Sequence, residues 1–169
     1  MRQLDDAALA NYLNDHLAGS VAALQLMGRI CDEHTECRLG RLMAELRADV
    51  EGEQEQLKLL LQSIDKPENP VAQTFAWVGE QISRLKISAG QNDETGVRLF
   101  EALEALLLGF TGRLSLWTML AEVQDVMPLP FEFRALAARA QEHIVRLEAE
   151  RVSAGRTALM LAAEPLVTA

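Results

Sequence analysis

The amino-acid sequence predicts an all-α fold, and three observations lead to that prediction. Aromatic residues make up 5% of the 169 residues while Leu and Ala are abundant, a composition that favours helices over strands. The prolines stand at only three places along the chain, so long stretches contain no helix breaker. In those stretches apolar residues recur every three or four positions, which is the spacing of an amphipathic helix. The sequence therefore predicts long helices and excludes an all-β fold.

Two of the predicted helices form a hairpin over residues 5–64. Each carries a stripe of apolar residues at helical spacing, and only a few residues around His34 separate them. Helices joined by so short a connection must lie antiparallel. Their expected limits are a cap at Asp5 or Asp6, an end near Asp32, a second start near Thr35 or Glu36 with Thr35 as the cap, and an end before Pro67.

A second hairpin is predicted over residues 93–162, after a crossover that covers residues 65–92. The crossover should carry a short helix from Pro70 to Gly90, because proline suits the first turn of a helix. The two long helices of this hairpin should also lie antiparallel, since their connection is short. Their expected limits are an end near Val126, a connection at Pro128 and Pro130, and an end towards Leu161, with Gly155 ending or loosening the last turns.

The length of the crossover decides the topology. The helix before it is about 40 Å long, and the crossover is long enough to return over that distance. The second and third long helices should therefore run parallel within one domain that covers residues 1–169. This antiparallel four-helix bundle, two helical hairpins joined by one long crossover with a short fifth helix, resembles the ferritin-like superfamily and its small bacterial members. The resemblance covers the four long helices and the crossover.

The resemblance implies a set of metal ligands that this sequence largely lacks. Metal-binding members carry one Glu on the first and third bundle helices and a Glu-x-x-His pair on each of the other two. The corresponding positions of this chain hold Leu17, Leu107, Val50-x-x-Glu53 and Ala140-x-x-His143. Only His143 matches the pattern, and a single imidazole does not make a di-metal site. The resemblance therefore implies a ferritin-like bundle with a degenerate di-metal motif.

Four polar residues remain candidates for an atypical metal site, namely His16, Glu53, Glu104 and His143. If they converge, they can hold a metal ion, with iron or manganese as the cofactor, or form a structural salt bridge. The alternative for His143 is a hydrogen-bonded histidine in the core. The alternative for the two glutamates is a solvated place at the edge of the helix seam. Without convergence no cofactor is expected.

A second candidate metal site lies at the turn of the first hairpin. Cys31, His34 and Cys37 stand three residues apart, and thiolate and imidazole are the ligands that zinc prefers. Structural zinc sites usually take four ligands, however, and this turn offers three. The alternative is a pair of reduced, half-buried cysteines, with a disulfide between them as a further possibility.

The charge and hydropathy of the sequence indicate which classes of partner are unfavourable. The net charge of −9 makes a nucleic-acid backbone or an anionic membrane surface an unfavourable partner. No apolar run approaches the roughly 20 residues that span a bilayer, and the first residues lack the pattern of a signal peptide. The sequence therefore predicts a cytoplasmic protein whose acidic excess lies on the surface.

The functional expectation that follows is a non-catalytic structural or binding protein that self-associates as a homo-dimer or another homo-oligomer. The alternative is an enzyme, an iron- or manganese-dependent oxidase or peroxide-handling protein with an atypical carboxylate and histidine site. A third hypothesis is a pocket for a small apolar ligand, because small residues stand near the middle of two helices and would leave room between them. The alternative is that these residues allow the helices to pack closely. These small residues are Gly19, Ser20, Gly109, Thr111 and Gly112.

Overall fold

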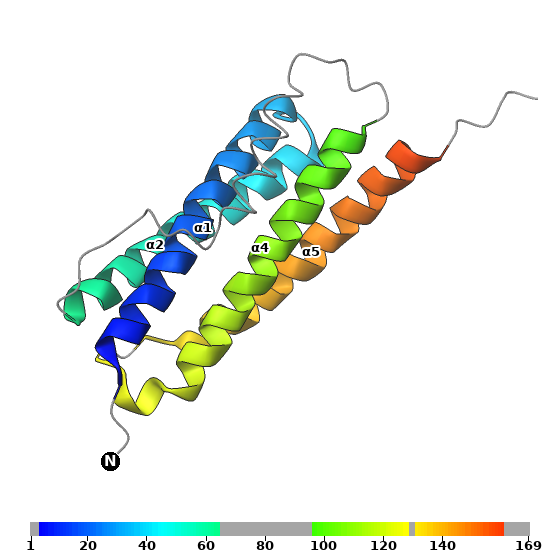
Figure 1. The fold of residues 1–169 in the computed structure, drawn as a ribbon. Helices are drawn as coiled ribbons and strands as arrows, with labels where there is room; N and C mark the ends of the chain where they lie inside the picture. Colours follow the sequence, from blue (N-terminus) through cyan, green and yellow to red (C-terminus); the bar gives the residue numbers. More distant parts are fainter. Residues whose placement is uncertain (1–3, 65–95, 129–130, 161–169) are drawn as a thin grey trace, which may run out of the picture.

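In the computed structural model, residues 4–64, 96–128 and 131–160 are described. They form four long helices, α1 (Asp6–Glu33), α2 (Arg38–Ser63), α4 (Val97–Glu122) and α5 (Phe133–Leu159), with a short 3₁₀ helix, η3 (Gln124–Val126), after α4 (Figure 1). The all-α prediction is confirmed for these residues. The short helix expected between Pro70 and Gly90 lies outside them.

The helices pack in two antiparallel pairs, α1 with α2 and α4 with α5, as the short connections predict. Helix α1 also packs against α4, which joins the two pairs. Figure 1 shows that α2 and α4 run in the same direction. The buried side chains agree, because the first half of α2 packs with the first half of α4 and the two ends pack together.

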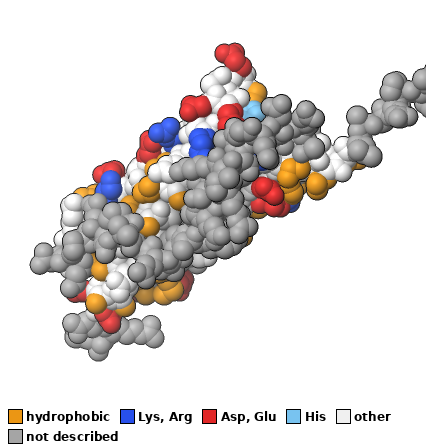
Figure 2. Space-filling view, turned by 45° about the horizontal axis from the view of Figure 1, so that its top comes forward, with side chains coloured by type: hydrophobic (Ala, Val, Ile, Leu, Met, Phe, Trp, Pro, Cys, Tyr) orange, Lys and Arg blue, Asp and Glu red, His pale blue; other side chains and the backbone are white. Residues whose placement is uncertain are grey.

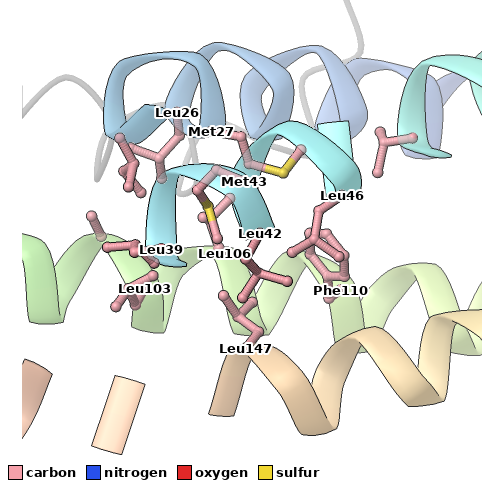
Figure 3. Packing of buried hydrophobic residues seen from close by; sticks show 13 residues of the cluster. Leu26, Met27, Leu39, Leu42, Met43, Leu46, Leu103, Leu106, Phe110 and Leu147 are labelled. Atoms are coloured by element: carbon pink, nitrogen blue, oxygen red, sulfur yellow. The ribbon is translucent and has the colours of Figure 1, made fainter. Parts of the chain in front are cut away.

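Two clusters of buried apolar side chains fill the space between the helices. The first, drawn in Figure 3, joins the second half of α1 and the first halves of α2 and α4 with Leu147 of α5. The second joins the first half of α1, the ends of α2 and α4, and the start of α5. Burial of one Leu or Phe side chain contributes about 1.5–3 kcal/mol, so these clusters supply most of the stability. Between the clusters lies a layer of polar side chains.

The helix starts follow local chemistry at α1 and tertiary packing at α2. Asp5 caps α1, and its carboxylate accepts hydrogen bonds from the backbone N–H groups of Ala7 and Ala8, both at 3.0 Å. The expected cap of α2 at Thr35 is wrong, because α2 begins at Arg38 with Cys37 as its N-cap residue. A Cβ atom on Gly40 would lie 2.0 Å from the carbonyl oxygen of His34. Because of this close approach, residues 34–37 form a turn and α2 begins only at Arg38.

The second pair differs from expectation at two places. Helix α4 ends at Glu122 and not at Val126, because the following backbone tightens into the 3₁₀ turn η3. Gly155 neither ends nor loosens α5, which continues to Leu159. Gly155 is buried, and a Cβ atom there would lie 2.9 Å from the ring of Phe100. The glycine therefore serves the close packing of α5 against α4.

Candidate functional site

The polar layer between the two apolar clusters is centred on Arg113 of α4. Its side chain is buried and forms a bidentate pair with the buried carboxylate of Glu53 on α2. The Nε atom donates to Oε2 and the Nη2 atom donates to Oε1, each at 2.5 Å. A planar guanidinium matches a carboxylate in this geometry, and both charges are compensated inside the core.

Two further side chains from different helices complete this network around the ion pair. The indole Nε1 of Trp117, also on α4, donates to Oε2 of Glu53 at 2.8 Å. The Nη1 atom of Arg113 lies 3.2 Å from Nδ1 of His143 on α5. Because a guanidinium can only donate, Nδ1 of His143 is the acceptor. The layer therefore ties α2, α4 and α5 together.

Asp49 of α2 forms the outer end of the network. Its Oδ2 atom lies 3.1 Å from Nε2 of His143. Because Nδ1 accepts from Arg113, the neutral imidazole carries its proton on Nε2, the nitrogen next to the Asp49 carboxylate. The Asp49 carboxylate also lies 3.7 Å from Nη1 of Arg139, at the half-exposed surface of the bundle. The chain of contacts from Trp117 to Asp49 therefore runs from the core to solvent.

The electrostatics of this layer keep His143 neutral. Burial lowers the pKa of His143 first, and the guanidinium of Arg113 lowers it further. The carboxylates of Asp49 and Glu53 act in the opposite direction without overcoming these effects. A protonated imidazole would turn an N–H group towards the Arg113 donor, so geometry and charge favour the same form.

The structure brings together two of the four candidate metal ligands, Glu53 and His143, but through Arg113. Glu104 is exposed, and its Oε1 atom lies 3.3 Å from Nη1 of Arg151. His16 lies against the edge of Tyr12, with 4.7 Å between the ring centroids. Glu53 and His143 approach each other, but Arg113 of α4 lies between them and Glu104 turns to Arg151 instead. Among the described residues, no three His, Cys, Asp or Glu side chains gather as metal ligands.

The cysteine-rich turn also forms no such group. Cys31 is half-buried near the end of α1, Cys37 is exposed at the N-cap of α2, and both are free thiols. The thiol of Cys37 donates to the backbone oxygen of His34 at 3.3 Å. Both cysteines of the described turn are free, and the turn gathers no group of three metal-ligating side chains.

A cavity of about 190 Å³ lies beside the polar layer, between α1, α2 and α4. Its lining is mostly apolar, and the small residues Gly19, Ser20, Gly109 and Gly112 border it. Its polar groups are largely satisfied, since Gln54 Nε2 donates to the Ser20 hydroxyl at 2.7 Å. His16 also lines the cavity, and burial lowers the pKa of its imidazole. Arg113, Glu53 and Trp117 form one wall of the cavity.

Arg113, Trp117 and Asp49 are the members of the site that sequence reasoning missed as functional residues. The buried face of α4 reads Leu103, Leu106, Phe110, Arg113, Trp117 and Leu120. These residues are three or four positions apart, so Arg113 is a charged residue within an apolar stripe, and that pattern is visible in the sequence. Asp49 carried no such signal, because it is one of several acidic residues along α2 and is only partly buried.

The described residues on the face drawn in Figure 2 gather no patch of one charge. Where described residues are visible in Figure 2, acidic, basic and hydrophobic side chains are interspersed. None of the described helices has the length and apolar character needed to span a lipid bilayer.

Comparison of the chain with protein-family models, with curated proteins and with solved structures finds no match.

Proposed function

We propose that this chain is a non-catalytic, ferritin-like helical bundle that binds a small, largely apolar molecule. The observation that carries the proposal is the apolar cavity of about 190 Å³ between α1, α2 and α4. A cavity of roughly 150 Å³ with an apolar lining holds a benzene molecule. The ligand expected here is therefore about the size of one substituted aromatic ring.

The ferritin-like assignment is supported by the topology. Two antiparallel helix pairs succeed one another along the chain, and α2 runs parallel to α4. Helices α2 and α4 are separated by residues 64–96, which is far longer than the other helix connections. One long crossover between two hairpins is the arrangement of ferritin-like bundles.

The side chains of the central layer do not fit a di-metal group. Both oxygens of Glu53 accept hydrogen bonds from Arg113, and Oε2 accepts a third from Trp117. The Nδ1 atom of His143 faces Arg113 as well. A guanidinium stays charged at any accessible pH, so a metal cation would have to displace a resident cation. This arrangement favours a binding role over an iron- or manganese-dependent oxidase.

Ligand binding in the cavity can be tested with substitutions at two glycines, one that borders the cavity and one that does not. A Cβ atom on Gly109 would meet no heavy atom within 4 Å, so Gly109→Leu places a branched side chain at the cavity wall. Gly52 on the exposed face of α2 has the same open surroundings but does not border the cavity, so Gly52→Leu is the matched control. Both changes replace a helical glycine by a good helix former.

The protein is titrated with toluene while the NMR signal of the Trp117 indole N–H is followed. The native chain and Gly52→Leu should show a saturable shift with similar affinity, and Gly109→Leu should bind at least tenfold more weakly. No saturable shift in the native chain, or equal affinity in Gly109→Leu, contradicts the proposal.

Metal analysis tests the proposed absence of a di-metal centre. The protein is purified after growth with added iron and manganese, and two bound ions per chain would contradict the proposal.

A further inference from the structure

The outer face of α5 carries a second apolar stripe that the core does not use. We call it the outer seam, and it consists of Ala138, Glu142, Val145, Ala149, Val152, Arg156 and Leu159. All seven residues are exposed, and Val145, Val152 and Leu159 have exposed fractions of 63%, 43% and 69%. The buried residues of α5, such as Ala140 and Leu147, lie on the opposite side of the helix. Helix α5 forms one edge of the molecule in Figure 1.

The spacing of the outer seam is that of a helix-packing stripe. Its members follow one another at alternating steps of four and three residues from Ala138 to Leu159. Apolar residues at this heptad spacing form the contact line between two long helices that pack side by side. The small Ala138 and Ala149 would let a partner helix approach closely.

The two charges in the outer seam identify the partner. Glu142 and Arg156 lie seven residues before and seven residues after Ala149. Neither forms an ion pair with another described residue. In an antiparallel pair of identical helices with a two-fold axis at Ala149, Glu142 of each helix lies beside Arg156 of the other. The seam is therefore complementary in charge to itself in the antiparallel orientation.

We infer that the outer seam is the contact surface for a second copy of this chain, in an antiparallel dimer with its two-fold axis at Ala149. A two-fold contact uses the same surface on both subunits, so every favourable pair occurs twice. One pair of helices buries less area than the standard interface of about 1,600 Å². A reversible dimer with a dissociation constant in the micromolar range is the expected form. This inference is independent of the cavity.

Charge reversal gives a sharp test, because the contact is symmetric. In a homodimer of Glu142→Arg, each introduced arginine lies beside the native Arg156 of the other copy. In a homodimer of Arg156→Glu, each introduced glutamate lies beside the native Glu142 of the other copy. Each variant alone should dimerise at least about tenfold more weakly than the native chain. An equal mixture of the two should form a heterodimer of near-native affinity, since each introduced charge then faces an opposite one. Glu101→Arg, on the exposed side of α4, changes the net charge by the same amount as Glu142→Arg and is its control.

Sedimentation equilibrium measures the dissociation constants, and circular dichroism checks that each variant keeps its helices. A second measurement tests the axis directly. With Cys31 and Cys37 replaced by serine, Ala149→Cys should form a disulfide-linked dimer on mild oxidation, and Glu101→Cys should not. A native chain that stays monomeric at millimolar concentration overturns the inference. Homodimers unaffected by the reversals, or a mixture that shows no heterodimer, overturn it as well.

Discussion

Arg113 of α4 and Glu53 of α2 meet as a bidentate ion pair inside the core, although 60 residues separate them in the chain. Each is a charged residue within an otherwise apolar stripe of its helix. The pair forms at the level where the two apolar clusters leave a gap, and it joins the two helical hairpins. It also occupies the groups that a metal ion would use.

Removing one member of this pair should strongly destabilise the fold. Glu53→Gln leaves the guanidinium of Arg113 buried without a counter-charge, and such changes cost about 3–5 kcal/mol. We expect this loss in the free energy of unfolding measured by urea titration. The exposed Glu104 forms a surface ion pair with Arg151, so Glu104→Gln should have little effect.

Replacing both members separates the cost of an unpaired charge from the value of the pair. The double variant Glu53→Leu with Arg113→Met should recover most of the stability lost in Glu53→Gln, since apolar replacements of buried pairs are often neutral or stabilising. An Arg113 that tolerates Glu53→Gln without loss would show that the guanidinium reaches solvent, contrary to its burial here.

The depressed pKa of His143 makes stability depend on pH. Burial and Arg113 hold this pKa below the ordinary value of about 6.5. At a pH between the pKa of His143 in the folded chain and its higher pKa in the unfolded chain, the unfolded chain binds the proton more readily. Stability therefore decreases as pH falls through this range. The contribution of His143 is fully present above about pH 6.5 and is lost as pH falls towards the folded pKa.

Urea titrations between pH 5 and 7.5 measure this slope, and NMR titration of the His143 ring measures the pKa. His143→Gln provides the comparison, because its amide can accept from Arg113 and donate to Asp49 without titrating. The slope over this range should be smaller in that variant. A ring that titrates above 6.5 would contradict the neutral form assigned to it.

Gly40 and Gly52 of α2 should respond in opposite ways to the same substitution. A Cβ atom on Gly40 would lie 2.0 Å from a backbone oxygen, so Gly40→Ala requires the turn before α2 to move. We expect a loss of about 1–3 kcal/mol or more. Gly52 has open space, and Gly52→Ala should stabilise by about 0.5–1 kcal/mol through helix propensity. Thermal unfolding of both variants checks this, and a gain in Gly40→Ala would refute the close contact.

Cys37 occupies an N-cap position but makes no capping hydrogen bond. Its extended backbone, with φ −112° and ψ 174°, suits a capping side chain. Cys37→Ser should therefore stabilise α2 by about 0.5–1 kcal/mol in denaturant titrations. Thr35→Ala, at the cap expected from the sequence, should change little. A loss of stability in Cys37→Ser would point to a role of the thiol, such as metal binding, that the geometry of the turn does not support.

Much of the fold could be predicted because its signals are local. The spacing of apolar residues predicted the four long helices, and Asp5 was predicted as a cap of the first. The short connections predicted the antiparallel pairs. The start of α2 and the end of α4 were missed for a tertiary reason. At α2 the packing of Gly40 under His34 overrides the capping preference of Thr35.

The candidate site was predictable only in part. Glu53 and His143 stood out as polar residues at inward positions of their helices, and both are buried. Glu104 was a candidate because helical spacing does not fix the rotation of α4 about its axis. In the structure it lies away from Glu53 and His143. The inward face of α4 carries Leu106 and Arg113, which turns Glu104 outwards to Arg151. Arg113 went unnoticed because arginine is seldom expected inside a core.

By itself the sequence determined the helical character, the four helix positions and the absence of a complete di-metal motif, because each depends on residues a few positions apart. Only the tertiary structure decided what replaces that motif. The meeting of Arg113, Glu53 and His143 depends on the relative rotation and depth of three helices. Those are set by the packing of the two apolar clusters as a whole, and no local pattern in the chain encodes them.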